Sequence, residues 1–423
     1  MIAFLLLLQA EHVVVVSIDG LRPEFYLGDY DAPALKALAA RGVSAKEVES
    51  VFPSTTYPSH ATIVTGVRPW KHGVTANTTW SESGGTRDWH WHARDLKART
   101  LWQAARAKSL KVALTYWPSS VGADVDWILG EIWDPEPKGT LDRLRAAATP
   151  GLLAEVCGAV GIPEAEMATD KAAIDRFTAR AAAYVFRTKQ PHLQLVHFLG
   201  VDEAQHKHGR DGARDALKLQ DEHLARVLAA VNDKTLVIVL GDHGFLDVHR
   251  NINPNALLRD EGWVTVKDGQ ASAWRALGRS SGGSMAVYVK DAKDVAAVRD
   301  LLRARAEGMY DVLERAELDG MGYDPAAALA LDPRDGWAFS GAFTARFVEG
   351  TPTVKGNHGQ RPTRPGLATG FVAAGPGVKP GTSIARMRLV DVAPTVAKVL
   401  GLELGDVEGV PLPFTPETPR TPR

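Results

Sequence analysis

Aspartate and histidine residues follow several apolar runs of this 423-residue chain, often with glycine beside them. Asp242 and His243 stand between two glycines, just after the apolar run at residues 235–240. Zinc accepts carboxylate oxygens and imidazole nitrogens as ligands. An aspartate after a strand can simply cap the next helix, but independent caps have no reason to recur at several strand ends. The repetition predicts a metal site. Its further candidate ligands are Asp19, Asp202, His206 and His358.

Asp202 and His206 are separated by four positions. In a helix this spacing places both side chains on one face, where they can bind a common ion or form an ordinary surface pair. The chain has thirteen histidines and a single cysteine, Cys157. A cysteine-based zinc cluster is therefore excluded, and histidine and carboxylate must hold any metal.

Thr56 offers a hydroxyl group at the expected start of a short helix, residues 60–65, with Pro58 suited to the first helical position. The positive end of a helix stabilises an alkoxide or a phosphoryl oxygen. Thr56 is thus a candidate nucleophile, and the simpler alternative is that its hydroxyl caps the helix.

These side chains need a framework, and the chain alternates between strands and helices. Residues 12–18 form an uninterrupted β-branched run, typical of a strand buried on both faces. The pattern predicts an α/β fold with a mostly parallel central sheet flanked by helices on both faces. In such sheets functional groups gather at the carboxyl ends of strands. Further strands are expected at 43–51, 111–116, 193–198, 235–240 and 370–374, and helices at 33–40, 100–108, 213–231 and 389–400.

Two regions interrupt the alternation, at about 117–190 and 262–357. Because the strand pattern resumes after each, we expect cap insertions in one catalytic domain at residues 11–410 rather than separate domains. Residues 411–423 are rich in proline and threonine and are expected to form a loose tail.

Residues 1–10 form a short apolar run that ends at Ala10. The run is far below the roughly 20 residues that cross a bilayer and has the length of a secretory signal core. We predict a signal peptide, a periplasmic or secreted location and no transmembrane anchor. The alternative is an early first strand in a cytoplasmic protein.

The charge of the chain is nearly balanced, with 49 basic and 50 acidic residues. Proteins that coat nucleic acids or bind anionic membranes usually carry a basic excess. We therefore expect a small-molecule partner, and the sequence leaves the oligomeric state open.

In order along the chain, several motifs resemble the alkaline phosphatase superfamily and, within it, the nucleotide pyrophosphatase/phosphodiesterase branch. Any one of them is weak, but the ordered set is specific and covers nearly the whole chain. They are residues 17–23 (SIDGLRP), 53–66, 72–77 (HGVTAN), 115–118 (TYWP), Asp202 with His206, 242–244 (DHG) and 358–359, with 391–395 (DVAPT) as a weaker signal.

The resemblance implies an alkaline-phosphatase-like fold and two zinc ions. Asp202, His206 and His358 would hold one ion. Asp19, Asp242 and His243 would hold the other, with Thr56 as its further ligand. A zinc-bound threonine hydroxyl would lose its proton near neutral pH and attack phosphorus, and the resulting phospho-threonine would be hydrolysed by water.

Two further positions follow from the resemblance. Asn77 would contact a non-bridging phosphate oxygen, and its neutral amide suits a diester. Tyr57 matches an aromatic position that stacks a nucleobase in relatives, or it is ordinary packing at a helix start. The branch commonly has Asn-His-Tyr after the proline, where this chain has Ser59-His60-Ala61.

The implied activity is zinc-dependent hydrolysis of phosphodiester or pyrophosphate bonds in nucleotide-type substrates. The alternatives are a phosphomonoesterase or phosphonate hydrolase on the same scaffold, a phosphoryl transferase, and a metal-binding protein without turnover. Zinc itself is not distinguished from other divalent metals.

Overall fold

The computed structural model describes residues 10–80, 88–132, 139–168, 170–350 and 352–413. Within these residues the largest sheet has eight strands. In spatial order they are β19 (Thr382–Ile384), β2 (Val43–Ala45), β18 (Phe371–Ala374), β7 (Thr235–Leu240), β1 (His12–Ile18), β6 (Leu193–Phe198), β4 (Val112–Thr115) and β5 (Trp127–Leu129).

The sheet is mostly parallel. β1 lies at its centre and pairs in parallel with β6 on one side and β7 on the other. The exception is β18, which runs antiparallel to both β7 and β2. Because β1, β6 and β7 run in one direction, their carboxyl ends lie at the same edge, which confirms the predicted fold class.

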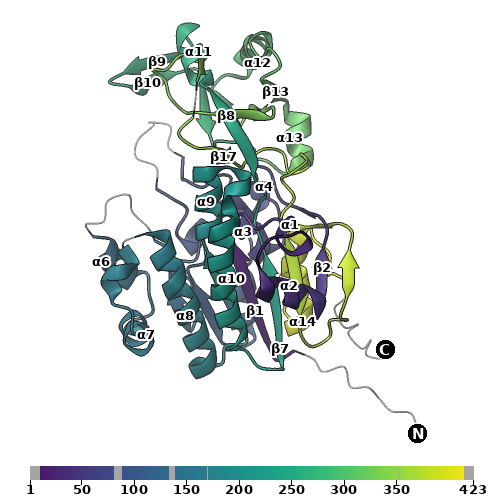
Figure 1. The fold of residues 1–423 in the computed structure, drawn as a ribbon. Coiled ribbons are helices and arrows are strands. Elements are labelled where there is room, and N and C mark those ends of the chain that lie inside the picture. Colours follow the sequence, from purple (N-terminus) through teal and green to yellow (C-terminus); the bar gives the residue numbers. More distant parts are fainter. Residues whose placement is uncertain (1–9, 81–87, 133–138, 169, 351, 414–423) are drawn as a thin grey trace.

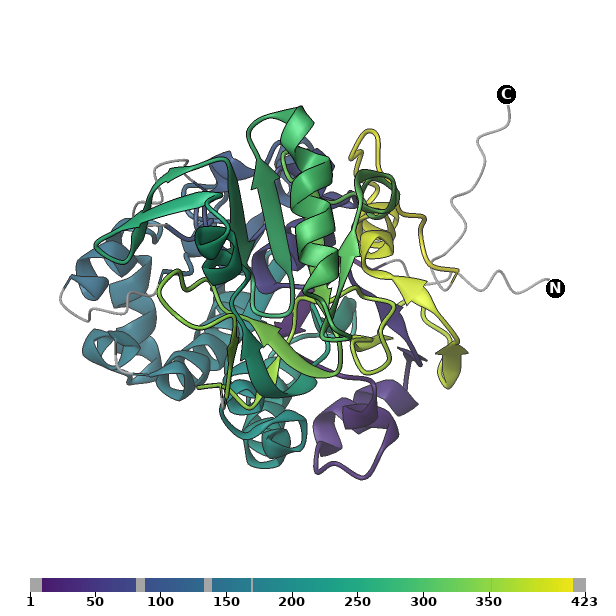
Figure 2. The same ribbon diagram turned by 90° about the horizontal axis from the view of Figure 1, so that it is seen from above.

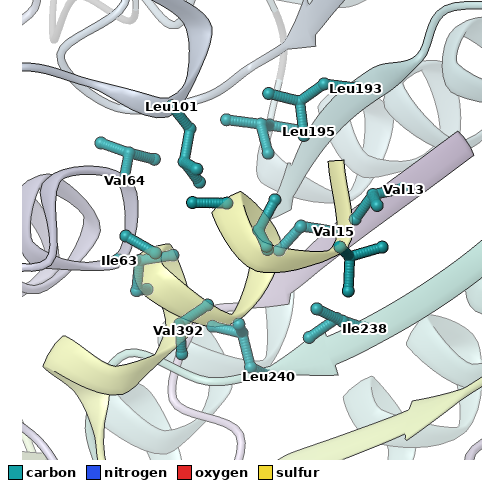
Figure 3. Packing of buried hydrophobic residues seen from close by; sticks show 14 of the residues in the cluster. Val13, Val15, Ile63, Val64, Leu101, Leu193, Leu195, Ile238, Leu240 and Val392 are labelled. Carbon is teal, nitrogen blue, oxygen red and sulfur yellow. The ribbon is translucent and has the colours of Figure 1, made fainter. Parts of the chain in front are cut away.

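Helices cover both faces of the sheet (Figure 1). Val13 and Val15 of β1 pack on one face together with α3 (Thr56–Thr65), α5 (Leu101–Ala107) and α14 (Val392–Leu400) (Figure 3). Val14 and Val16 pack on the other face. That second face is covered by α2 (Pro33–Ala40), α8 (Lys171–Lys189) and α10 (Arg214–Leu228). Alternating valines buried on both faces explain the unbroken apolar run of β1.

The chain around the candidate nucleophile differs from the sequence prediction. Helix α3 begins at Thr56 rather than at residue 60, so Pro58 is its third residue and not its first. The strand expected at 43–51 is divided into β2 and the short β3 (Val48–Glu49). β3 leaves the main sheet to pair with β20 (Met387–Arg388).

The first predicted cap contributes to the main layers instead of rising above them. Residues 117–190 supply β5 at the edge of the central sheet and α8 on one of its faces. Among the described residues of this stretch, the shorter helices α6 (Thr140–Ala146) and α7 (Leu152–Val160) lie to the side (Figure 1). Pattern alone missed this because β5 has only three residues.

The second predicted cap is a lobe above the carboxyl ends of the strands (Figure 1). It begins earlier than residue 262, with β8 (Leu246–Ile252) and α11 (Pro254–Asp260). We call residues 246–349 the upper lobe; viewed from above, it lies across the middle of the molecule (Figure 2). One of its sheets has the order β11 (Ala276–Ser280), β12 (Met285–Val289), β14 (Leu329–Pro333) and β13 (Tyr310–Leu313).

The two ends of the chain fall largely outside the described residues. These leave out residues 1–9 of the predicted signal peptide and residues 414–423 of the predicted tail. Among the helices that the structure describes, none has both the length and the apolar character needed to cross a membrane.

Candidate dinuclear metal site

Two groups of potential metal ligands lie at the carboxyl edge of the central sheet. The first, the Asp202 group, consists of Asp202, His206 and His358, and the second, the Asp19 group, consists of Asp19, Asp242 and His243. Within each group the ligand atoms lie within 4.8 Å of one another. The structure thus assembles both sets that the resemblance implied.

Elements far apart in the sequence supply the Asp19 group. Asp19 directly follows β1, and Asp242 and His243 follow the adjacent β7 after a single glycine. Asp242 Oδ1 accepts hydrogen bonds from the backbone N–H groups of Gly20 and His243, each at 3.0 Å. Gly20 has a positive φ of 70°, a conformation that glycine adopts readily. This turn leaves Asp242 Oδ2 facing His243 Nε2 at 3.2 Å.

The Asp202 group joins a helix to a loop. Asp202 and His206 lie on one face of α9 (Gly200–His208), with 3.4 Å between Asp202 Oδ1 and His206 Nε2. The predicted helical spacing is therefore correct. His358 follows β17 (Gly356–Asn357) and places its Nε2 3.5 Å from the same Asp202 oxygen.

Backbone carbonyls fix how the imidazole rings point. Nδ1 of His206 lies 2.9 Å from the carbonyl of Gly356, and Nδ1 of His358 lies 3.0 Å from that of Ser54. Nδ1 of His243 lies 3.2 Å from the carbonyl of Gly244. A carbonyl can only accept, so each Nδ1 carries the proton and each Nε2 is left to bind a metal. This arrangement is common around metal-binding histidines.

The two groups adjoin each other. The rings of His243 and His358 stack with their centroids 3.5 Å apart and an interplanar angle of 9°. Each ring belongs to a different group, so two ions would be close neighbours. Paired metals of this kind can stabilise both the attacking and the leaving oxygen of a phosphoryl displacement.

Contacts through Ser54 and His60 link the chain around Thr56 to both groups. The backbone carbonyl of Ser54, two residues before Thr56, accepts the hydrogen bond from His358. The carbonyl of Thr56 lies 2.7 Å from Nδ1 of His60. That Nδ1 is also 3.7 Å from Asp242 Oδ2. The helix cap is Thr55, not Thr56, and neither threonine makes a side-chain capping bond. The hydroxyl of Thr56 therefore does not serve as a helix cap.

Asn77 lies beside the same helix start. Its Oδ1 accepts a hydrogen bond from the backbone N–H of Tyr57 at 3.0 Å. Because this bond uses the amide oxygen, the Nδ2 group is the part of Asn77 that remains for a phosphate oxygen. Asn77 is only partly buried, so a substrate can reach it.

Tyr57 is completely buried. It packs with Ala61 and Val74, and its ring lies 5.4 Å from that of Trp89. In this conformation its ring has no face open to a nucleobase. The structure therefore favours the packing interpretation of Tyr57 over base stacking.

Charge crowding sets the protonation of the Asp19 group. Burial and the charge of Asp19 raise the pKa of Asp242 to about 7. Burial would lower the pKa of His243, but the charges of Asp242 and Asp19 outweigh it and raise that pKa to about 9. Burial would also raise the pKa of Asp19, yet its contacts with His197 and His243 hold it well below its usual range. Without a metal, His243 is protonated at neutral pH.

The Asp202 group has a different protonation pattern. Burial and the neighbouring His243 lower the pKa of His358 to about 3, so this ring is neutral at pH 7. Burial opposes ionisation of Asp202, but the nearby His206 and Lys171 bring its pKa to about 2. An ionised carboxylate and a neutral imidazole are the forms that bind zinc.

Buried polar atoms without hydrogen-bond partners indicate whether a metal fits these groups. Asp19 Oδ1, Asp202 Oδ1, Asp242 Oδ2 and His243 Nε2 are buried and have no hydrogen-bond partner among the described residues. Buried polar atoms are normally paired, and these four come from the two ligand groups. Two carboxylate–imidazole sets with unpaired oxygens suit divalent cations such as zinc.

Sequence reasoning missed three buried or partly buried residues around the ligands. His197 lies 3.3 Å from Asp19. As a polar residue in the apolar strand β6, it was visible in the sequence. His60, which was assigned no role, connects Thr56 to Ser17 through its two ring nitrogens. Lys171 lies 3.8 Å from Asp202, and no signal in the sequence marked it.

The chain is similar to known proteins of one family. The family model for type I phosphodiesterases / nucleotide pyrophosphatases matches residues 13–361. Ectonucleotide pyrophosphatase/phosphodiesterase family member 3 of Rattus norvegicus is 25% identical over 253 residues, which are 55% of this chain and 24% of that protein. Bis(5'-adenosyl)-triphosphatase enpp4 of Mus musculus is 32% identical over 126 residues, 28% of this chain and 26% of that protein. The matches thus span about a quarter of these relatives.

Solved structures share the fold. Murine and human ectonucleotide pyrophosphatase/phosphodiesterase 5 each superpose with a TM-score of 0.67 at 19% identity, covering 94% of this chain and 97% of theirs. The residues that the family model matches, 13–361, include Thr56 and all six residues of the two ligand groups. The chain belongs to the type I phosphodiesterase / nucleotide pyrophosphatase family.

Proposed function

We propose that this protein is a zinc-dependent hydrolase of phosphodiester or pyrophosphate bonds in nucleotide-type substrates, and that Thr56 is its nucleophile. The observation that carries the proposal is the meeting of two adjoining ligand groups with the first residue of α3. If Thr56 only capped a helix and the ligand groups were only ion pairs, a second ligand group and the partly buried amide of Asn77 would not be needed.

Bound zinc would supply Lewis acidity, lowering the pKa of a hydroxyl or water and neutralising charge on the phosphate. The chain's own residues perform the remaining work. Thr56 Oγ attacks phosphorus, the bond from phosphorus to the leaving oxygen breaks, and a phospho-threonine ester forms. Water then attacks phosphorus, the bond to Thr56 Oγ breaks, and the threonine hydroxyl is regenerated.

Asn77 and the start of α3 orient the phosphate in both steps. The first N–H groups of a helix lack partners within it and attract anions. Asn77 Nδ2 is a neutral donor, held in place by the bond from Tyr57 N–H to its oxygen. A neutral donor suits the single negative charge of a diester better than the double charge of a monoester.

A neighbouring structure supports a nucleotide substrate and a threonine nucleophile. Murine ectonucleotide pyrophosphatase/phosphodiesterase 5 was solved as an inactive threonine-to-alanine variant in complex with AMP. In the present chain Tyr57 is buried, so the base of a bound nucleotide would need to contact a surface other than the ring of Tyr57.

The proposed function is tested by a substrate panel run together with metal analysis. We expect the nitrophenyl ester of thymidine monophosphate to be hydrolysed with a kcat/KM at least about tenfold above that of nitrophenyl phosphate. We also expect about two zinc ions per chain, from the two ligand groups. Preference for the monoester or for a phosphonate would favour the alternative hydrolases, and transfer of the phosphoryl group to an added alcohol would favour a transferase.

Zinc binding should release protons. The pKa of His243 is raised to about 9, so its ring is protonated at pH 7 and must become neutral to bind zinc. Zinc affinity should therefore rise as the pH increases from 7 toward about 9. Calorimetric titration with zinc in two buffers of different ionisation enthalpy measures this release. Identical heats in both buffers would contradict the protonation assigned to His243.

A further inference from the structure

Three buried side chains, Asp19, His197 and Glu131, form a row that begins at the Asp19 group. His197 lies between two carboxylates, with Nε2 3.3 Å from Asp19 Oδ2 and Nδ1 3.6 Å from Glu131 Oε2. All three side chains are at most 4% exposed. Burying charge is costly unless the charges are paired, so this row requires an explanation.

The sheet brings the row together from three separate strands. His197 is the fifth residue of β6 and is in register with Ser17 of β1, two residues before Asp19. Glu131 follows β5, which is separated from β6 by β4. The row thus crosses the carboxyl edge of the sheet, from its centre to its end.

The row determines which oxygen of Asp19 faces His197 and which faces the rest of the Asp19 group. Both ring nitrogens of His197 face carboxylate oxygens at ion-pair distances and make no hydrogen bond among the described residues, and each is placed to carry a proton toward its carboxylate. With Oδ2 facing His197, the other oxygen of Asp19, Oδ1, faces His243 Nε2 at 3.2 Å and has no hydrogen-bond partner. Asp19 therefore offers one defined oxygen to the ion of its group.

We propose that His197, itself oriented by Glu131, is a positioning residue that fixes Asp19 as a one-oxygen metal ligand. The proposal rests on the proposed function, because it requires a metal in the Asp19 group. Without His197, Asp19 could rotate and lose its alignment with Asp242 and His243. Residues that orient metal ligands typically change metal affinity by roughly 10–100-fold when replaced.

Glu131 reaches Asp19 through His197 in this arrangement. Its Oε2 lies 3.6 Å from Nδ1 of His197 and pairs with the ring at the nitrogen that does not face Asp19. Its effect on zinc should therefore disappear once His197 has been replaced. A residue that merely stabilises the fold would not show this dependence.

The test is a double-mutant cycle with zinc affinity as its readout. The variants are His197→Leu, Glu131→Leu and the double variant. The double variant replaces the buried pair with apolar side chains of comparable size, a change that often preserves folding, whereas each single variant leaves an unpaired buried group and is expected to be less stable. Zinc is titrated against a competing chelator, and elemental analysis gives the zinc retained per chain. The melting temperature of each metal-free variant measures folding separately.

We expect His197→Leu to lower the affinity for one of the two zinc ions by roughly 10–100-fold and to leave the affinity for the other nearly unchanged. Glu131→Leu should lower the affinity for the same zinc ion. The double variant should bind that ion no more weakly than His197→Leu alone. His72→Gln is the matched control, because His72 is also fully buried but contacts Thr62 instead of a ligand. It should retain both zincs.

Two results would overturn the inference alone: two zincs bound as tightly as in the unmodified protein, or additive effects of the two substitutions. Glu131→Gln and His197→Gln serve the same purpose if the leucine variants do not fold. An unmodified protein that binds no divalent metal would overturn the proposed function as well.

Discussion

Replacing Thr56 with alanine should lower the turnover of a nitrophenyl diester by at least about 10³-fold, because loss of a nucleophile removes the first chemical step. Both zinc ions should remain, since each ligand group keeps its three side chains. Activity assays and elemental analysis on the same preparation check the two parts together. Thr56→Ser, which retains a hydroxyl, should preserve part of the activity.

Thr55→Ala is the matched control for this substitution. Thr55 is the adjacent residue, is also buried, and makes no side-chain capping bond. It should keep turnover within a few-fold of the unmodified protein. Near-normal rates in Thr56→Ala would show that another group, or water itself, attacks phosphorus.

His358→Ala should remove one zinc ion per chain and most of the diesterase activity. His358 supplies one of the three ligands of the Asp202 group, and the carbonyl of Ser54 holds its Nδ1. With two ligands left, we expect zinc affinity to fall by at least about 10²-fold. Asp242→Asn should have the corresponding effect on the Asp19 group.

His249→Ala is the control, because His249 is exposed and outside both groups. It should retain two zincs and full activity. If His358→Ala and Asp242→Asn both retained two zincs, the ligand assignment would be wrong even if the enzyme were a phosphodiesterase. The competing-chelator titration distinguishes weak binding from loss of binding.

Much of the framework was predictable from the sequence because the strands are apolar and the ligands follow them directly. β6 and β7 have the predicted bounds, and Asp242 and His243 follow β7 where the glycines indicated a turn. The helical spacing of Asp202 and His206 was also informative, since it requires only local structure.

Contacts between distant segments were not predictable. His358 joins Asp202 across the sheet edge, and this placement came only from family resemblance, since local spacing gives no such information. The loop after His358 is attached to the upper lobe by Arg361 and Arg364, which both pair with Asp332 of β14. No periodicity in the sequence indicates which arginine meets which aspartate.

Burial was the other quantity that the sequence left undetermined. Tyr57 follows the nucleophile in a position that could face a ligand or the core, and Trp89 covers it from another part of the chain. His197 was visible as a polar residue in an apolar strand, but its partners Asp19 and Glu131 lie on different strands. Both cases depend on which segments the fold places side by side.

The stereochemical course at phosphorus tests the account's central claim most directly. A chiral phosphorothioate diester is hydrolysed in isotopically labelled water, and the configuration of the product is determined. Each in-line displacement inverts phosphorus, so attack by Thr56 followed by attack of water should give net retention. Net inversion would show a single displacement by water and would contradict a covalent threonine intermediate.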